Sequence, residues 1–417
     1  MTTRSHDHAD LMTAATRPDS RGVALQGQAA GVFRGSGLWT PVALVILAAS
    51  VAMPVLLRLS QGHSDISAQS AMAARMVQGG GWISYTLWYP LIYLTSSGSA
   101  DPALLRSIAV SLLVAAVAAK TLAVYYLSWA CTRRRAAAAA VALLMLVAMP
   151  LLSPGLAQGI YLGNVTPNVW HNSTQMFALP FALAAFVAAV ALLRAPTRSR
   201  ALLCGLLILI STMAKPNYTL ALLPVLGLAL LWTMRRAVTR PSRQLAVICL
   251  AFVPAVLLLG SQYLLVFGRN GVRETHLVVA PFAVWGTYSV SIPVSVGLSI
   301  AGPLAVLLVL PGRWRNSEAM VLAWLVLGVS VLQLTLLAER LAGGAIAMDG
   351  NFFWGSYSAI FMVFVVSAIS LARAFLDGPT SRVRRVAMAA AAVVLSLHGA
   401  SGIYYVVWAA VTSTAYL

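Results

Sequence analysis

The sequence predicts an all-α protein, a polytopic bundle of about eleven transmembrane helices. Hydrophobic residues make up 60% of the chain and charged residues only 9%, and the mean hydropathy is +0.85. Apolar runs near the length of about 20 residues that a bilayer requires recur along the whole chain. Arginines gather in short clusters between these runs. The net charge of +18 is therefore interpreted as a topology signal and indicates no nucleic-acid partner.

The first 37 residues differ from the rest of the chain. They are rich in Ser, Thr, Asp, Arg and Gly, and they lack the basic and then apolar order of a cleaved signal peptide. We predict a disordered cytoplasmic tail over residues 1–37 and a transmembrane domain over residues 38–417. Cys131, Cys204 and Cys249 each lie near one end of an apolar run, so disulfides are not expected.

Eleven apolar segments are predicted to cross the membrane. Their ranges are 38–60, 102–130, 136–153, 175–194, 201–214, 218–233, 244–267, 294–311, 319–338, 353–372 and 386–411. With the N-terminus inside, the five inner loops hold sixteen arginines, a cluster in each loop, against eight Lys or Arg residues elsewhere beyond the tail. The positive-inside rule therefore favours this topology, and the Ala- and Arg-rich composition indicates a bacterial cytoplasmic membrane.

Residues 277–291 allow two alternatives. This segment contains Pro281 and ends just before Pro293, and it is either one more full span or a re-entrant piece on the outer side. A full span would place every later arginine cluster outside, against the positive-inside rule. We therefore favour the re-entrant alternative.

Most of the chemically useful side chains fall in the predicted outer loops. The longest polar stretches, residues 159–175, 214–219, 267–276 and 338–355, are all outer loops, whereas the inner loops hold little besides arginine. Five carboxylates lie outside: Asp65, Asp101, Glu274, Glu339 and Asp349. Binding and catalytic residues are concentrated in such loops. We therefore expect the functional site on the extracytoplasmic face.

The first outer loop, residues 61–101, opens with a carboxylate and a weakly amphipathic segment. After Asp65, apolar residues recur at helical spacing, which predicts a helix lying in the membrane interface. A second explanation of this carboxylate stays open, because Asp65 or Ser64 is also well placed to cap the helix. The aromatic residues that follow form either an interfacial belt or the wall of a groove; they are Trp82, Tyr85, Tyr89 and Tyr93.

This arrangement resembles the opening of glycosyltransferases of the GT-C fold. The shared pattern is a first span, an acidic residue early in the outer loop, a surface helix in "SAQSAMAARMVQGG", and the aromatic stretch "WISYTLWYPLIYL" before the second span. The rest of the chain is similar by loop layout only. Enzymes of this family are polytopic and move sugars from polyprenyl-phosphate donors. The resemblance implies a GT-C-like fold with Asp65 as the catalytic base.

The residues give little support for a metal. Many members of the family carry two adjacent acidic residues in this loop, but Ser64 and Ile66 flank the single Asp65 here. His171 and His276 lie in different loops, without the spacing of paired metal ligands. The ligand spacing therefore does not support a divalent metal, and no other cofactor is indicated.

Transfer from a sugar phosphate with inversion requires one carboxylate to take the proton of the acceptor hydroxyl, and cations to bind the leaving phosphate. Lys215, in "MAKPNYT" between two short spans, is the first candidate for the phosphate, although it also fits a lysine that snorkels to the interface. Arg340 is either a second candidate or a structural partner of Glu339. Arg269 and Arg273, in "GRNGVRETH", complete the set.

Residues 163–175, "GNVTPNVWHNSTQ", form the densest polar stretch beyond the tail. Amide and imidazole groups bind sugar hydroxyls, carboxylates accept hydrogen bonds from them, and an indole offers a stacking face. The predicted sugar- or acceptor-binding residues are Asn168, Trp170, His171 and Asn172 from this stretch, with Glu339 and Asp349 from residues 338–355. Alternatively, the stretch is only a capped turn that leads into the fourth span.

The predicted function is that of a membrane glycosyltransferase, moving a sugar from a polyprenyl-phosphate-linked donor to an extracytoplasmic glycan or lipid acceptor. Two alternatives stay open. A lipid-linked polysaccharide polymerase or ligase would share the outer site and use Arg269 and Arg273. A transporter or flippase would have internal repeats and charges at the bilayer midplane. No convincing repeat is found, and Lys120 is the only clear midplane charge.

Overall fold

The computed structural model describes residues 38–62, 64–79, 85–153, 161, 163–236, 241–267, 275–312, 317–379 and 381–415. Contacts divide the chain into two units, Met1–Ala43 and Leu44–Leu417. The second unit contains the site described below. The tail predicted over residues 1–37 lies outside the described residues.

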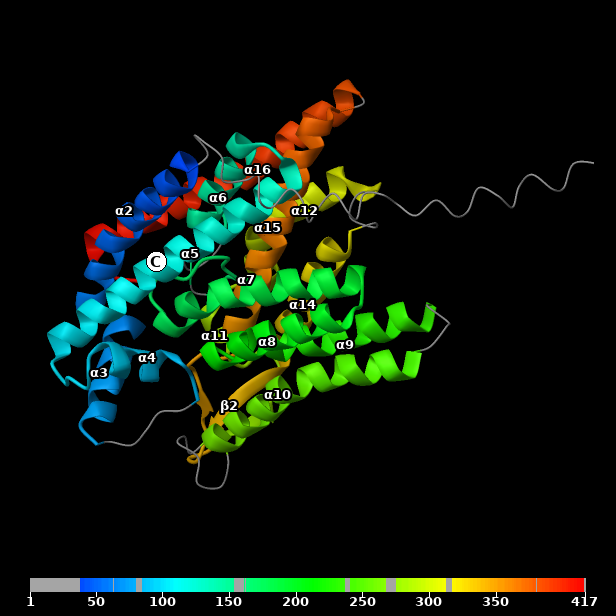
Figure 1. The fold of residues 1–417 in the computed structure, drawn as a ribbon. Coiled ribbons are helices and arrows are strands. Elements are labelled where there is room, and N and C mark those ends of the chain that lie inside the picture. Colours follow the sequence, from blue (N-terminus) through cyan, green and yellow to red (C-terminus); the bar gives the residue numbers. More distant parts are fainter. Residues whose placement is uncertain are drawn as a thin grey trace, which may run out of the picture. The chain divides into compact units, whose positions relative to one another are not determined.

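A helix occupies each range that was predicted to span the membrane (Figure 1). These helices are α2 (Trp39–Gln61), α5 (Pro102–Thr132), α6 (Arg135–Val147), α7 (Ser173–Arg194), α8 (Arg198–Ala214), α9 (Asn217–Arg236), α10 (Pro241–Phe267), α12 (Ile292–Val309), α14 (Glu318–Leu336), α15 (Phe353–Asp377) and α16 (Arg382–Thr412). Within the described residues, eight helices are long and apolar enough to cross a membrane: α2, α5, α7, α10, α12, α14, α15 and α16. The prediction of a polytopic helical membrane protein is thus confirmed. Helices α6, α8 and α9 are not among these eight, so the predicted number of eleven spans is not confirmed.

Helix α15 forms the centre of the second unit. It is apolar on all sides and buried almost continuously from Phe353 to Ile369, as expected of a helix surrounded by protein. It contacts α5, α6, α7, α9, α12 and α14. Small residues allow some of the outer helices to approach closely, because a Cβ atom added at Gly205 in α8 would lie 2.1 Å from the carbonyl oxygen of Ala251 in α10.

The predicted helix after Asp65 is present as α3 (Asp65–Val77), and a second helix, α4 (Trp88–Thr95), follows it before α5. One face of α3, with Ile66, Ala73 and Met76, is buried. The helix contacts α4, α5 and α7. It is therefore fixed to the bundle at the end where α5 and α7 begin.

Residues 275–291 contain no helix long enough to span a membrane, so the full-span alternative for this segment is wrong. Strand β1 (Thr275–Val279) pairs antiparallel with β2 (Leu337–Leu341), and β2 pairs antiparallel with β3 (Ile346–Ala347). A one-turn helix, α11 (Trp285–Tyr288), comes next, and α12 follows it. The sequence did not predict this small sheet.

The two ends of the helices differ in chemistry. Arg133, Arg194 and Arg373 come from three predicted inner loops, and all three act electrostatically on Cys131 at the C-terminal end of α5. The opposite helix ends carry α3, α4 and the three-stranded sheet. The chain therefore separates a basic end from an end that is rich in polar loops.

Candidate functional site

A cavity of about 560 Å³ opens at the polar end of the bundle. Its lining comes from many separate parts of the chain: α3, residues 85–89, the segment before α7 with the first turn of that helix, the turn between α8 and α9, the end of α10, α11, the loop around β2 and β3, and the start of α15. The main polar and aromatic lining residues are Asp65, Gln69, Tyr85, Tyr89, Tyr161, His171, Asn172, Thr174, Lys215, Asn217, Tyr288, Glu339, Asp349, Asn351, Trp354 and Tyr357. Six of the residues predicted from the sequence thus line one cavity: Asp65, His171, Asn172, Lys215, Glu339 and Asp349.

Helix α3 presents its carboxylate to this cavity. Ser64 stands at the N-cap position but makes no side-chain cap, because its hydroxyl donates to the carbonyl oxygen of Leu59 at 2.5 Å. The Oδ2 atom of Asp65 accepts a hydrogen bond from Nδ2 of Asn172 at 2.5 Å. Gln69, one helical turn later, accepts the backbone N–H of Thr174 through Oε1 at 3.3 Å. Asp65 is therefore held toward α7 rather than used to cap its own helix.

The amide of Asn172 connects the carboxylate to a cation. Its Oδ1 atom caps α7 by accepting the backbone N–H of Gln175 at 2.9 Å, and it also accepts from Nζ of Lys215 at 3.1 Å. Both partners are donors, so they fix Oδ1 on that side and turn Nδ2 toward Asp65. The capped turn that the sequence offered as an alternative is thus present, and its cap residue Asn172 also lines the cavity.

Lys215 lies at the C-terminal end of α8. The hydroxyl of Thr86 donates to the carbonyl oxygen of Ala214, and the N–H of Leu87 donates to the carbonyl oxygen of Met213, each at 2.7 Å. Residues 86 and 87 therefore supply hydrogen bonds to two of the last carbonyl groups of α8. The Nζ atom donates to Oγ1 of Thr174 at 2.9 Å and lies 4.3 Å from the centroid of the Trp354 ring. Burial lowers the pKa of Lys215 to about 7, although the nearby carboxylate acts in the other direction.

His171 is buried beside the carboxylate, with Nε2 4.0 Å from Oδ2 of Asp65. Burial lowers its pKa to about 4; Asp65 raises it and Lys215 lowers it further. The imidazole is therefore neutral at neutral pH, and its contact with the carboxylate is not an ion pair. The ring of Tyr161 meets it edge to face, with centroids 4.5 Å apart. This packing orients the imidazole at the cavity wall.

The wall formed by β2 and the loop after it contains two more carboxylates. Glu339 is buried on β2 and accepts from Nδ2 of Asn351 at 2.6 Å. Asn217, at the start of α9, donates to the carbonyl oxygen of Asn351 at 2.8 Å. Asp349 is exposed and lines the cavity in the same loop. This wall therefore offers carboxylate and amide groups suited to hydroxyl groups of a ligand.

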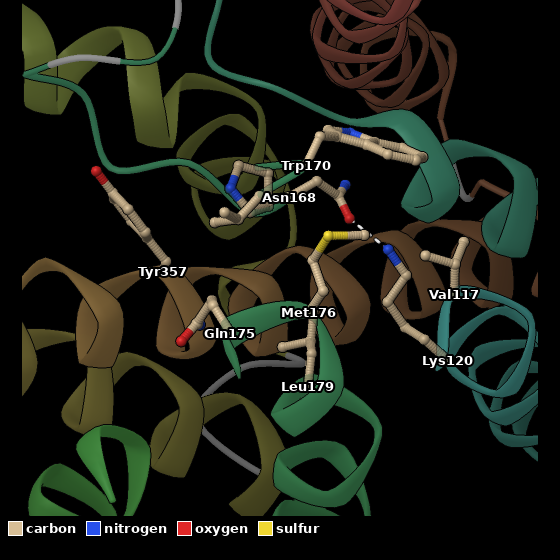
Figure 2. Close-up of a pocket in the computed structure, with 10 residues that line it drawn as sticks. Val117, Lys120, Asn168, Trp170, Gln175, Met176, Leu179 and Tyr357 are labelled. Carbon is tan, nitrogen blue, oxygen red and sulfur yellow. Dashed lines mark hydrogen bonds between the residues drawn. The ribbon is translucent and has the colours of Figure 1, made fainter. Parts of the chain in front are cut away.

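Other predicted residues lie elsewhere. Asn168 and Trp170 are buried and line a separate void of about 10 Å³ together with Lys120 (Figure 2).

Arg340 follows Glu339 on β2, so its side chain points to the opposite face of the strand; it is exposed and is not among the residues that line the cavity. Arg269 and Arg273 lie outside the described residues. The stacking face expected from Trp170 is offered at the cavity by Trp354 instead.

Several lining residues escaped the sequence reasoning. Gln69 could have been found from its place one helical turn after Asp65. Thr174 follows the predicted Asn172 by two positions, as a residue in the first turn of a capped helix. No sequence signal marks Asn217 or Asn351, because ordinary polar residues at the ends of helices have the same appearance.

The chain matches no family model and no curated protein. Within the described residues, no group of three or more His, Cys, Asp or Glu side chains is placed to hold a metal ion. The chemistry of the site is therefore inferred from its carboxylates, amides, lysine and aromatic rings.

Proposed function

We propose that the protein is a membrane glycosyltransferase of the GT-C type, which moves a sugar with inversion from a polyprenyl-phosphate-linked donor to a glycan or lipid acceptor on the extracytoplasmic side. One observation carries the proposal. Asp65 and Lys215, a candidate base and a candidate phosphate ligand from distant parts of the chain, line one cavity and share the amide of Asn172. The apolar helices around this cavity suit a substrate with a lipid tail.

The carboxylate is arranged to act as a general base. Asn172 holds Oδ2 of Asp65, and the side chain is 34% exposed, so the other oxygen has access to a hydroxyl group in the cavity. In the proposed reaction the acceptor hydroxyl gives its proton to Asp65 while its oxygen bonds to the anomeric carbon of the donor sugar. The bond from that carbon to the phosphate oxygen breaks at the same time. A phosphate needs no general acid to leave.

Lys215 is proposed to stabilise the leaving phosphate. Its ammonium group lines the cavity beside Thr174 and Trp354, and a charge-assisted hydrogen bond from it to a phosphate oxygen would be strong. The ammonium group carries three N–H donors, and two of them donate to Asn172 and Thr174, so the third can donate to a phosphate oxygen. Leu220, Val266 and Phe267 line the same cavity and would contact the first part of a polyprenyl chain. Arg340 is no longer a candidate for the phosphate, because it does not line the cavity, whereas Arg269 and Arg273 remain candidates.

The transporter alternative receives less support from the structure. Lys120 would have to line a substrate pathway, but it is buried and donates to Asn168 at 2.5 Å. It is not among the residues that line the large cavity. An outer cavity that contains a candidate base and a candidate phosphate ligand fits an enzyme better.

The proposal is tested with purified protein in lipid nanodiscs. The protein is incubated with a panel of polyprenyl-phosphate hexoses and pentoses and with membrane glycan extracts as acceptors. The expected result is the release of polyprenyl phosphate from at least one donor, together with a product of inverted anomeric configuration. Failure to turn over any donor under conditions in which the donor binds would contradict the proposed function.

A further inference from the structure

Lys120 places a positive charge inside the bundle, away from the cavity. It lies in α5 and is only 5% exposed. Its Nζ atom donates to Oδ1 of Asn168 at 2.5 Å (Figure 2). The same atom lies 5.4 Å from the centroid of the Phe361 ring in α15. The ammonium group thus joins two helices to the segment that precedes α7.

The partner of Lys120 is itself fixed. Asn168 donates through Nδ2 to the carbonyl oxygens of Met145 at 3.1 Å and Ala148 at 2.9 Å, at the C-terminal end of α6. Because both partners are carbonyl oxygens, the amide can only present Oδ1 to the lysine. The carbonyl groups at a helix C-terminus also carry partial negative charge, which compensates a nearby cation.

Residues 163–172, here called the buried segment, depend on such anchors. The segment is not helical, and its described side chains are buried. The carbonyl oxygen of Gly163 accepts Nε1–H of Trp285 at 2.7 Å, and the N–H of Val165 donates to Oγ of Ser299 at 2.9 Å. Irregular backbone inside a membrane protein persists only where protein groups satisfy it. The anchors therefore determine where the end of the segment, Asn172, lies.

A lysine is a costly choice for this anchor. Removing an ammonium group from water is costly, and a neutral side chain of similar size would be cheaper to bury. What the charge adds is a hydrogen bond roughly twice as strong as one between neutral groups. This hydrogen bond holds Asn168, which lies four residues before Asn172. The amide of Asn172 joins Asp65, the candidate base, to Lys215, the candidate phosphate ligand.

We propose that Lys120 is a positioning residue, which holds the buried segment through Asn168 so that Asn172 meets both Asp65 and Lys215. Its effect on the buried segment is independent of what the cavity binds. Its effect on catalysis rests on the proposed function. The two effects are measured separately.

The structural effect is measured by hydrogen–deuterium exchange in nanodiscs. In Lys120→Met the amide protons of Val165 and Gln175, which are bonded to Ser299 and Asn172, are expected to exchange on the order of 10-fold faster than in the wild type. Ser128→Ala is the matched control, because Ser128 is fully buried in the same helix. It should exchange like the wild type. Wild-type exchange over residues 163–175 in folded Lys120→Met would overturn the inference.

A second variant keeps the test decisive if Lys120→Met does not fold. The side chain of glutamine is one bond shorter than that of lysine, so Lys120→Gln cannot keep the present bond to Asn168 without movement. It is expected to show the same faster exchange, and wild-type exchange in this variant also overturns the inference. Lys120→Arg retains the charge and is expected to restore slower exchange in part.

The catalytic effect is measured as kcat per folded, monodisperse protein. Displacement of Asn172 by about 1 Å is expected to lower kcat about 100-fold in Lys120→Met, with partial recovery in Lys120→Arg. A purely structural lysine would lower the yield and the Tm but leave the kcat of the folded fraction unchanged. If exchange rises in the variant while the wild type transfers no sugar, the proposed function fails and the positioning inference stands. If the wild type transfers sugar and the variant has wild-type kcat and exchange, the inference fails and the function stands.

Discussion

Asn172 makes four side-chain hydrogen bonds, and each has a separate consequence for the site. Oδ1 accepts from the N–H of Gln175, the hydroxyl of Thr174 and the ammonium of Lys215, while Nδ2 donates to Asp65. The first two bonds fix the start of α7, and the last two join cation and carboxylate. A single amide thus couples the fold of the helix to the geometry of the candidate catalytic residues.

Replacing this amide tests the coupling. In Asn172→Ala the carboxylate loses its donor and Lys215 loses an acceptor, so kcat is expected to fall about 100-fold while the folded protein is still obtained. Asn172→Asp keeps the cap of α7 but places a second negative charge against Asp65, and the two like charges repel. Steady-state kinetics of both variants test this. Wild-type activity in Asn172→Asp would contradict the role of Asn172 in joining Asp65 to Lys215.

The titration of Lys215 predicts how donor binding depends on pH. Only the protonated form of Lys215 binds phosphate strongly, and burial lowers the pKa of Lys215 in the protein without donor to about 7. Affinity for polyprenyl phosphate should therefore be full below pH 7 and fall about tenfold for each pH unit above it. Lys215→Met should weaken binding about 10- to 100-fold at pH 6, the effect of a lost charge-assisted hydrogen bond.

Lys215→Arg is the control for this pH dependence. A guanidinium group stays protonated at every accessible pH, so the fall above pH 7 should disappear in this variant. Binding measured by fluorescence quenching in nanodiscs between pH 6 and 9 decides the matter. A wild-type affinity that does not change over this range, or that rises with pH, would remove Lys215 from the phosphate site.

At the scale of helices and strands, the sequence was most informative where apolar periodicity is long. Every predicted spanning range contains a helix, because about 20 apolar residues in a row leave the backbone few other ways to satisfy its hydrogen bonds. The sheet was missed because its strands have at most five residues and β1 pairs with a strand about sixty positions later. Likewise, Asp65 and Asn172 are 107 positions apart, so their individual chemistry was predictable but their hydrogen bond was not.

Packing of α8 against α10 is expected to depend on a glycine. A Cβ atom at Gly205 would lie 2.1 Å from the carbonyl oxygen of Ala251, so Gly205→Ala must separate the two helices. We expect a loss of about 1–3 kcal/mol of stability, the usual range for overpacking. Because α8 carries Lys215 at its end, donor affinity should fall as well.

Gly260→Ala provides the matched control, since a Cβ atom at this position of α10 meets nothing within 4 Å. Alanine is a better helix former than glycine by about 1 kcal/mol, so the Tm of this variant should equal or exceed that of the wild type. Thermal unfolding in one detergent compares the two variants. Equal Tm values for both would show that the contact between α8 and α10 is looser than the structure has it.

At the scale of the whole molecule, the proposed function requires the cavity to face away from the cytoplasm. The basic helix ends and the cavity lie at opposite ends of the helices, so the positive-inside rule predicts an extracytoplasmic cavity. In a cysteine-free background, a membrane-impermeant thiol reagent should label Ala342→Cys, next to β2, on intact cells. Ser199→Cys, at the start of α8, should be labelled only after lysis. The reverse pattern would mean that the site faces the cytoplasm.

The proposed function depends on Asp65 acting as the base in sugar transfer from a polyprenyl-phosphate donor. The most direct measurement is single-turnover transfer by wild type and Asp65→Asn, with donor binding measured on the same samples. Asparagine retains the size and an oxygen that can face Asn172 but cannot take a proton. We expect unchanged donor affinity and a transfer rate lower by about 10²- to 10⁴-fold. Transfer by Asp65→Asn at the wild-type rate would contradict this role of Asp65.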